Sequence, residues 1–218
     1  MAFANQIVLV AHVVAGFFGL LVGLVPMFAQ KGSGLHRKAG LAFYWSMFFV
    51  CTSATWLVFF KPSSVFLLFI ALFSFYMAYA GKRAFVIQKN KGAFLQDKLI
   101  ALGALLVGMY MAGMGVYASV QHGFGFQQVL FMVFGTFFAY TGQQDLKLYW
   151  MADAPKKQGL AQHITRMMGG YIAFVTAFAT VNSRYIPHES PWVDMAAWLL
   201  PGILGGFAIS RFLQRFKV

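Results

Sequence analysis

The stretch AHVVAGFFGLLVGLVPMFAQKGSGLHRKAGLAFYWSMF, residues 11–48, decides the fold, because it joins two apolar runs through a short basic connection. Each run belongs to an apolar segment of about 20 residues, the length that a helix needs to cross a hydrocarbon core of ~30 Å. The connection carries Lys31, Arg37 and Lys38, charges that remain at a membrane surface. The stretch therefore predicts two membrane-spanning helices joined at that surface.

The same alternation continues to the end of the chain and predicts an all-α, polytopic integral membrane protein with seven transmembrane helices. The chain is 60% hydrophobic and only 10% charged, whereas a soluble domain carries about 25% charged residues. The first residues lack the basic start of a secretory signal, so the first span is expected to be retained. We expect one transmembrane domain over residues 1–218. The predicted spans are approximately 7–29, 39–60, 63–81, 99–121, 126–144, 165–183 and 193–210.

The positive charges predict the orientation of these spans. Basic residues concentrate in the loops that remain on the cytoplasmic side of a membrane. With the N-terminus outside, fifteen of the seventeen lysines and arginines fall in inner loops or the C-terminal tail, and only Lys61 and Arg184 fall outside. The pattern predicts an outer N-terminus and a cytoplasmic C-terminus in an inner membrane.

The net charge of +12 raises the question of a nucleic-acid partner. These charges flank apolar spans and no stacking platform accompanies them, so no nucleic acid is expected. The expected partners are the lipid bilayer and anionic lipid head groups at the inner face. The attraction of each basic residue to these head groups is worth about 1 kcal/mol. A homo-oligomer or a larger membrane complex is a further possibility. Small residues four apart let helices approach closely. Gly19 with Gly23 and Gly202 with Gly206 have this spacing, whereas Gly103, Gly108 and Gly113 are five residues apart and drift around their helix.

Ionisable groups near the predicted inner face form the strongest candidate site. His36 and His163 stand at the predicted starts of the second and sixth spans, and Asp145 closes the fifth span. A helix N-terminus disfavours imidazolium, so both rings should remain neutral and able to act as ligands. Arg37 and Arg166 lie within three residues of these histidines. The set fits a metal held by His36, His163 and Asp145, or a haem whose propionates meet the arginines. The alternative is that these residues only cap helices and pair with one another.

A second candidate layer lies near the predicted outer face. His12 falls about one and a half turns inside the first span and should face the bundle, where it needs a partner. Gln121, His122 or a cofactor could supply that partner, or a neighbouring helix could bind the ring. Paired histidines at both faces would fit two haem groups stacked across the membrane. In that reading His12 and His122 are cofactor-binding candidates.

The run at 11–48 resembles the opening signature of an uncharacterised bacterial family of multi-pass membrane proteins, a domain of unknown function. The matching pattern is a histidine in the first span, then KG, HR and a glycine. The segments GQQDLK and QHITRMMGG resemble later positions of the same family. The resemblance covers most of the chain and implies no activity. Its motif positions here are His12, Lys31, Gly32, His36, Arg37, Gly40, Asp145, His163, Arg166 and Met167.

Three functions remain open from the sequence. The leading hypothesis is a redox or metal-cofactor membrane protein, with haem b bound by His36 and His163 and with Asp145 behind them. A cofactor-free channel, transporter or assembly subunit is the second. A membrane hydrolase with zinc on the same three residues is the third. The sequence alone does not decide whether the protein is an enzyme.

Overall fold

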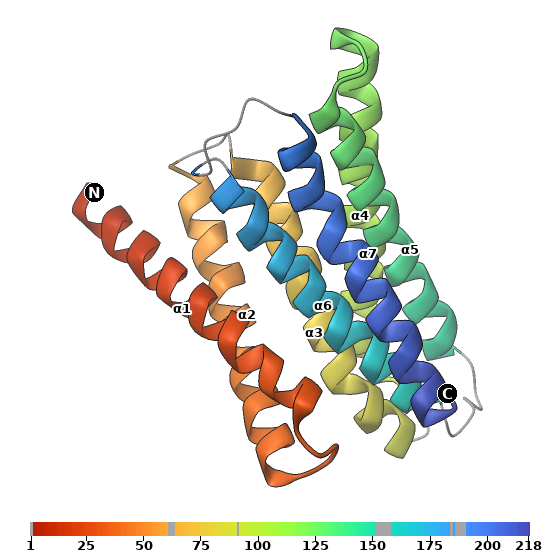
Figure 1. The fold of residues 1–218 in the computed structure, drawn as a ribbon. Helices are drawn as coiled ribbons and strands as arrows, with labels where there is room; N and C mark the ends of the chain where they lie inside the picture. Colours follow the sequence, from red (N-terminus) through yellow and green to blue (C-terminus); the bar gives the residue numbers. More distant parts are fainter. Residues whose placement is uncertain (1, 61–63, 91, 151–157, 184, 186–190) are drawn as a thin grey trace. The chain divides into compact units, whose positions relative to one another are not determined.

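The computed structural model describes residues 2–60, 64–90, 92–150, 158–183, 185 and 191–218. Within these residues the chain is all-helical, as predicted, with seven α-helices and no strand (Figure 1). Each helix has between 25 and 28 residues. The helices are α1 (Ala2–Phe28), α2 (Gly34–Val58), α3 (Val65–Lys89), α4 (Leu95–His122), α5 (Phe126–Trp150), α6 (Gln158–Ser183) and α7 (Pro191–Phe216).

Six of these helices are long and apolar enough to cross a membrane, namely α1, α2, α3, α4, α6 and α7. The exception is α5, which carries glutamines in its first turn and the sequence Gln143-Gln144-Asp145 near its end. These polar residues lower its mean hydropathy, although its centre is apolar. The helices are those of a multi-pass membrane protein, and the six apolar ones imply a lipid environment.

Several helices extend beyond the predicted spans. The predicted third span ends at residue 81, but α3 continues to Lys89. Helix α6 begins at Gln158, seven residues before the predicted start. The reason is that helix backbone persists through polar residues outside the hydrocarbon layer, whereas hydropathy only marks the apolar part. As a result His163 lies in the second turn of α6, and Asp145 lies inside α5.

The chain divides into two compact units, each of which has its own packing. Unit 1 comprises Met1–Tyr79 and Arg166–Phe216, and unit 2 comprises Ala80–Thr165 with Lys217–Val218. The core of unit 1 brings α2, α3 and α6 together. Its buried residues are Phe43, Met47, Val50, Ala78 and Phe174.

Glycines let α1 lie close to its neighbours in unit 1. A Cβ atom added at Gly23 would stand 2.7 Å from the Tyr171 ring and 2.9 Å from the Phe43 ring. At Gly19 it would stand 2.8 Å from the Phe174 ring. The prediction that Gly19 and Gly23 form a contact face is confirmed, because any larger side chain would collide with α2 and α6.

In unit 2, α4 and α5 form an antiparallel pair whose backbones touch. A Cβ at Gly108 would stand 2.8 Å from the Gly135 carbonyl oxygen, and one at Gly115 would stand 2.8 Å from the Gln128 carbonyl oxygen. At the other end, a Cβ at Gly142 would stand 2.6 Å from the Leu105 nitrogen. The contact glycines are seven residues apart on each helix, which places them on one face.

The predicted glycine face at Gly202 and Gly206 is wrong, whereas the series Gly103, Gly108 and Gly113 drifts around its helix as expected. Among the described residues, nothing stands within 4 Å of a Cβ added at Gly103 or Gly113, so only Gly108 of that series meets α5. A Cβ added at Gly202 or Gly206 on α7 likewise has no described atom within 4 Å. Gly205 approaches the side chain of Ile172 on α6 instead, because it points in another direction around the helix than Gly202 and Gly206.

Candidate functional site

The connection between α1 and α2 is built residue by residue from the motif KGSGLHR. Lys31 Nζ donates hydrogen bonds to the carbonyl oxygens of Pro26 and Met27, both at 2.7 Å. These carbonyls belong to the last turn of α1 and have no partner within a helix that ends there. Gly32 takes a φ of +77°, a conformation that favours glycine, and thereby reverses the chain. Ser33 then caps α2.

His36 ties the start of α2 back to the end of α1. Its backbone N–H donates to Ser33 Oγ at 3.2 Å, which is the N-cap bond of α2. Its ring Nδ1 lies 3.1 Å from the Pro26 carbonyl oxygen. A carbonyl only accepts, so Nδ1 carries the hydrogen, and in the neutral ring the lone pair is on Nε2. The motif residues Lys31, Gly32 and His36 therefore have a structural role in this turn.

His12 finds its partner on α2. Its Nδ1 lies 2.8 Å from Ser53 Oγ, and that hydroxyl donates its hydrogen to the Phe49 carbonyl oxygen at 2.7 Å. Because the hydroxyl hydrogen is used, the imidazole is the donor, and Nδ1 again carries the hydrogen. Of the partners considered for His12, the neighbouring helix is the one observed. His122 is exposed at the end of α4 in unit 2.

His163 connects α6 to α3 in unit 2. Its Nδ1 lies 2.9 Å from the Gly81 carbonyl oxygen. Its ring packs against Phe85, one turn further along α3, with the ring centroids 4.9 Å apart. The acceptor is once more a carbonyl, so the hydrogen is on Nδ1 and the lone pair on Nε2. Three of the candidate histidines thus share one tautomer, each fixed by an interhelical contact.

Asp145 lies inside unit 2 and is only 1% exposed. Gln162 Nε2 donates to its Oδ1 at 3.0 Å, and the same nitrogen lies 3.4 Å from the Tyr149 hydroxyl. Gln162 is itself buried and immediately precedes His163. The two neighbouring side chains of α6 therefore reach different helices, α5 through Gln162 and α3 through His163.

A second buried carboxylate, which the sequence reasoning missed, is Asp97 in the first turn of α4. It is fully buried and accepts two hydrogen bonds from Arg83, from Nε at 2.7 Å and from Nη2 at 2.8 Å. The Phe94 backbone N–H donates to the same carboxylate at 3.0 Å and completes the cap of α4. An isolated acid in the basic segment 81–98, between the third and fourth predicted spans, was the signal that could have indicated this pair. Such a two-pronged pair fixes α3 against α4.

The candidate residues fall in both units. His12, His36, Arg37 and Arg166 belong to unit 1, whereas His122, Asp145 and His163 belong to unit 2. Arg37 is exposed and Arg166 is half-buried. Among the described residues, no group of three or more His, Cys, Asp or Glu side chains is placed to hold a metal ion. The inner and outer ligand sets remain predictions, since each draws on both units.

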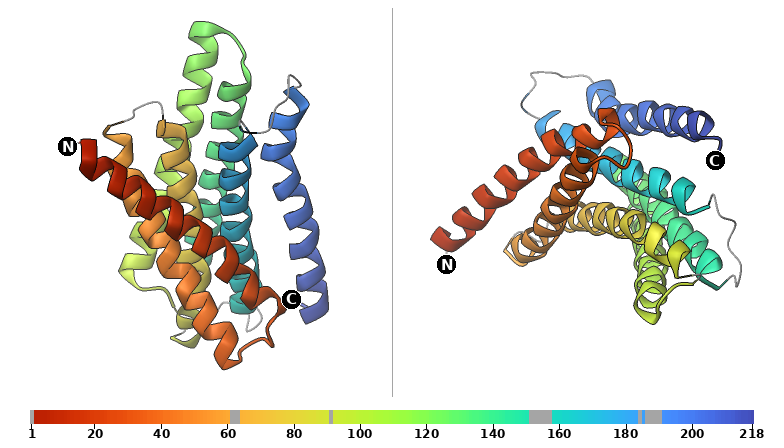
Figure 2. Two further views of the ribbon diagram at one scale, coloured as in Figure 1. Left: turned by 60° about the vertical axis from the view of Figure 1, so that its left-hand side comes forward. Right: turned by 90° about the horizontal axis from the view of Figure 1, so that it is seen from below.

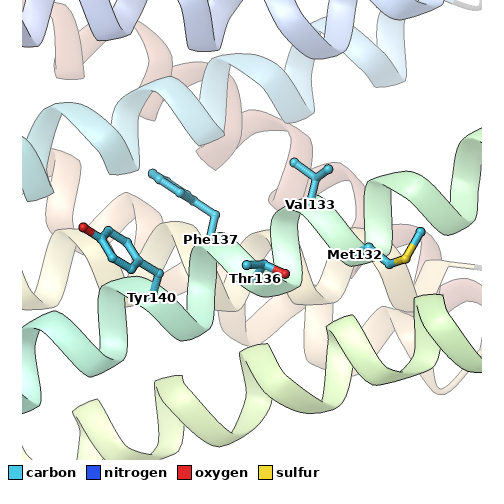
Figure 3. A pocket seen from close by; sticks show the side chains of 5 residues that line it. All are labelled: Met132, Val133, Thr136, Phe137 and Tyr140. Carbon is cyan, nitrogen blue, oxygen red and sulfur yellow. The ribbon is translucent and has the colours of Figure 1, made fainter.

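An open depression lies on α5, lined by the five side chains drawn in Figure 3. Its volume is about 490 Å³. Its polar groups are the hydroxyls of Thr136 and Tyr140, and the amide of Gln144 donates to the latter. The depression is otherwise apolar, which suits contact with a hydrocarbon chain rather than a charged ligand.

Comparisons with known proteins give no relative for this chain. No family model, no curated protein and no solved structure matches it. The functional argument therefore depends on the residues and contacts described above.

Proposed function

We propose that the chain crosses a bacterial inner membrane seven times, with its N-terminus outside and its C-terminus in the cytoplasm. Support for α5 as a span comes from its packing on α4. Contacts run from Gly115 with Gln128 at one end to Gly142 with Leu105 near the other. A helix that lies along a membrane-spanning helix over its length must cross the same layer. Its 25 residues reach about 37 Å, enough for the hydrocarbon core.

Within that topology, we propose a histidine-centred cofactor site at the cytoplasmic side, with b-type haem as the bound group. His36 and His163 would be the axial ligands. The observation that carries this proposal is their common tautomer, in which Nδ1–H donates to a main-chain carbonyl and Nε2 holds the lone pair. This is the arrangement that orients a metal-binding imidazole. Arg37 and Arg166 would meet the propionates, and Asp145 would lie behind the ligands.

Bound haem would supply reversible one-electron transfer. The residues of this chain would bind it, keep the two imidazoles in one tautomer and exclude water. His12 has the same tautomer, so the outer pair with His122 is proposed as a second site of the same kind. The resemblance to the uncharacterised membrane-protein family implies no activity, and it is compatible with this role.

A cofactor-free channel, transporter or assembly subunit is the second candidate, and one observation favours it. The buried carboxylates of unit 2 already bind side chains of adjacent helices, Asp145 through Gln162 and Asp97 through Arg83. Such contacts hold helices together without any ligand. In this case anionic lipids and other copies of the chain, or a larger complex, would be the partners.

The test is the visible absorption spectrum of the full chain, expressed with haem supply and purified in detergent. The haem proposal expects a Soret band that shifts on reduction. His36→Ala and His163→Ala should each remove the share of the band that belongs to the inner haem. His188→Ala, which removes a histidine that is not a proposed haem ligand, should leave the band unchanged. Colourless protein that folds normally would refute the haem proposal and favour the second candidate. One zinc per chain by metal analysis, lost in the same two variants, would favour the hydrolase.

A further inference from the structure

Two cations of unit 1 come together where α1 and α7 end. Lys31 Nζ lies 4.8 Å from the centroid of the Phe212 ring. One turn later, the ring of Phe216 stacks on that of Phe212, with the ring centroids 6.4 Å apart. The Arg215 guanidinium lies 6.0 Å from the centroid of the Phe216 ring. The left-hand view of Figure 2 shows the end of α7 beside the end of α1. Arg211 precedes Arg215 by four residues and so lies on the same face of α7.

No carboxylate balances these charges among the described residues of unit 1. The acid described there is Asp194, in the first turn of α7, where Ser183 binds it. It stands 17 residues before Arg211, about 25 Å along the helix. Partial burial and the neighbouring Arg215 both lower the pKa of Lys31, as expected where cations approach without a counter-ion.

The described part of the chain does not use all the N–H donors of this cluster. Lys31 gives two N–H groups to the carbonyls of α1, which leaves a third. Arg211 and Arg215 are exposed, and neither donates a hydrogen bond to a described residue. Arginine offers several N–H donors in a planar fork that matches the oxygens of a phosphate.

We propose that Lys31, Arg211 and Arg215 form a binding site for the phosphodiester head group of an anionic phospholipid. The adjoining surface of α7 is what favours a lipid over free phosphate. Its side chains Ile203, Leu204 and Phe207 are between 54% and 70% exposed, one to two turns from Arg211. Acyl chains that lie along this face would bury it while the phosphate reaches the cations. The glycines at 202 and 206 leave the same part of the helix open.

This inference rests on the proposed membrane topology, which places the cluster at the cytoplasmic leaflet. It deepens the general attraction of basic loops to anionic lipid, because it assigns the effect to three residues. It does not depend on any cofactor.

The experiment measures the thermal unfolding midpoint of the detergent-purified full chain during titration with dioctanoyl phosphatidylglycerol. Dioctanoyl phosphatidylcholine and inorganic phosphate serve as separate arms. The test variant is Arg211→Gln with Arg215→Gln, since these exposed residues make no described hydrogen bond. The matched control is Lys89→Gln with Lys147→Gln, which removes two exposed charges from unit 2.

Phosphatidylglycerol should raise the midpoint of the wild-type chain, while phosphatidylcholine should not. The double arginine variant should raise the apparent dissociation constant about 30-fold, because each basic residue near an anionic head group is worth about 1 kcal/mol. The control should change it less than about twofold, since its charges lie outside the cluster. Equal responses to the two lipids, equal losses in the two variants, or an equal shift with inorganic phosphate would overturn the site. Absorption spectra of the same samples report separately on the haem proposal. Because a detergent micelle has no inner and outer leaflet, an error in the proposed membrane orientation would not change the lipid-binding result.

Discussion

Replacing Gly108 by alanine should separate α4 from α5 and destabilise the protein. The added Cβ would stand 2.8 Å from both the Ala139 Cα and the Gly135 carbonyl oxygen, and nearer still to the Ala139 backbone nitrogen. Ordinary contact begins at 3.4 Å, so the helices must part by at least 0.6 Å. Neither neighbour is a flexible side chain that could move aside. Overpacking of this kind costs about 1–3 kcal/mol.

Gly103→Ala is the matched control, because it makes the same change on the same helix where nothing described stands within 4 Å. In a helix, glycine to alanine gains up to about 1 kcal/mol of intrinsic stability. The two variants should therefore differ by about 2–4 kcal/mol in the free energy of unfolding. The assay is reversible unfolding in mixed detergent–SDS micelles, followed by far-UV circular dichroism.

Equal stability of the two alanine variants would refute the reasoning, since it would mean that the α4 and α5 backbones do not touch at Gly108. A second check uses Gly135→Ala, which faces the same contact from α5. Combined with Gly108→Ala, it should cost less than the sum of the single losses, because helices that have already parted admit a second methyl group more easily.

Three further predictions use the same unfolding assay. Asp97→Asn should lower the unfolding free energy by about 3 kcal/mol, because it leaves the partly exposed Arg83 without its carboxylate; a loss under about 1 kcal/mol would contradict a buried ion pair. Ser33→Ala removes the N-cap hydroxyl and should cost about 1 kcal/mol, whereas Ser33→Asp should retain the cap. Ser53→Ala leaves the His12 ring without its acceptor and should cost about 0.6–1.7 kcal/mol; in a background of His12→Ala it should cost almost nothing, and full additivity would argue against the bond.

Much of the fold was predictable, because a hydrocarbon layer imposes one backbone solution on any long apolar segment. The all-helical class and six apolar helices follow directly from hydropathy. Helix ends were less predictable. The α3 backbone continues to Lys89 and α6 starts at Gln158, since helices persist in water through residues that hydropathy treats as loop.

The candidate site was predictable by residue type and not by contact. The rarity of ionisable groups singled out His36, Asp145 and His163. Their observed partners were not predictable, because two are main-chain carbonyls and the third is the amide of Gln162. Every residue has a main-chain carbonyl, so the sequence does not indicate which one accepts a hydrogen bond. Asp97 was passed over because one acid among many basic residues resembles an ordinary surface charge.

The sequence by itself determined that this chain forms long apolar helices, and the clustering of basic residues predicts their orientation. Those properties depend on the transfer of each segment from water to lipid, which composition alone sets. Tertiary structure decided which glycines meet a neighbour, Gly108 and Gly205 rather than Gly103 and Gly202. It also decided which ring nitrogen of His12, His36 and His163 carries the hydrogen. Both depend on the rotation of one helix against another, which is fixed only when the side chains of both helices pack together.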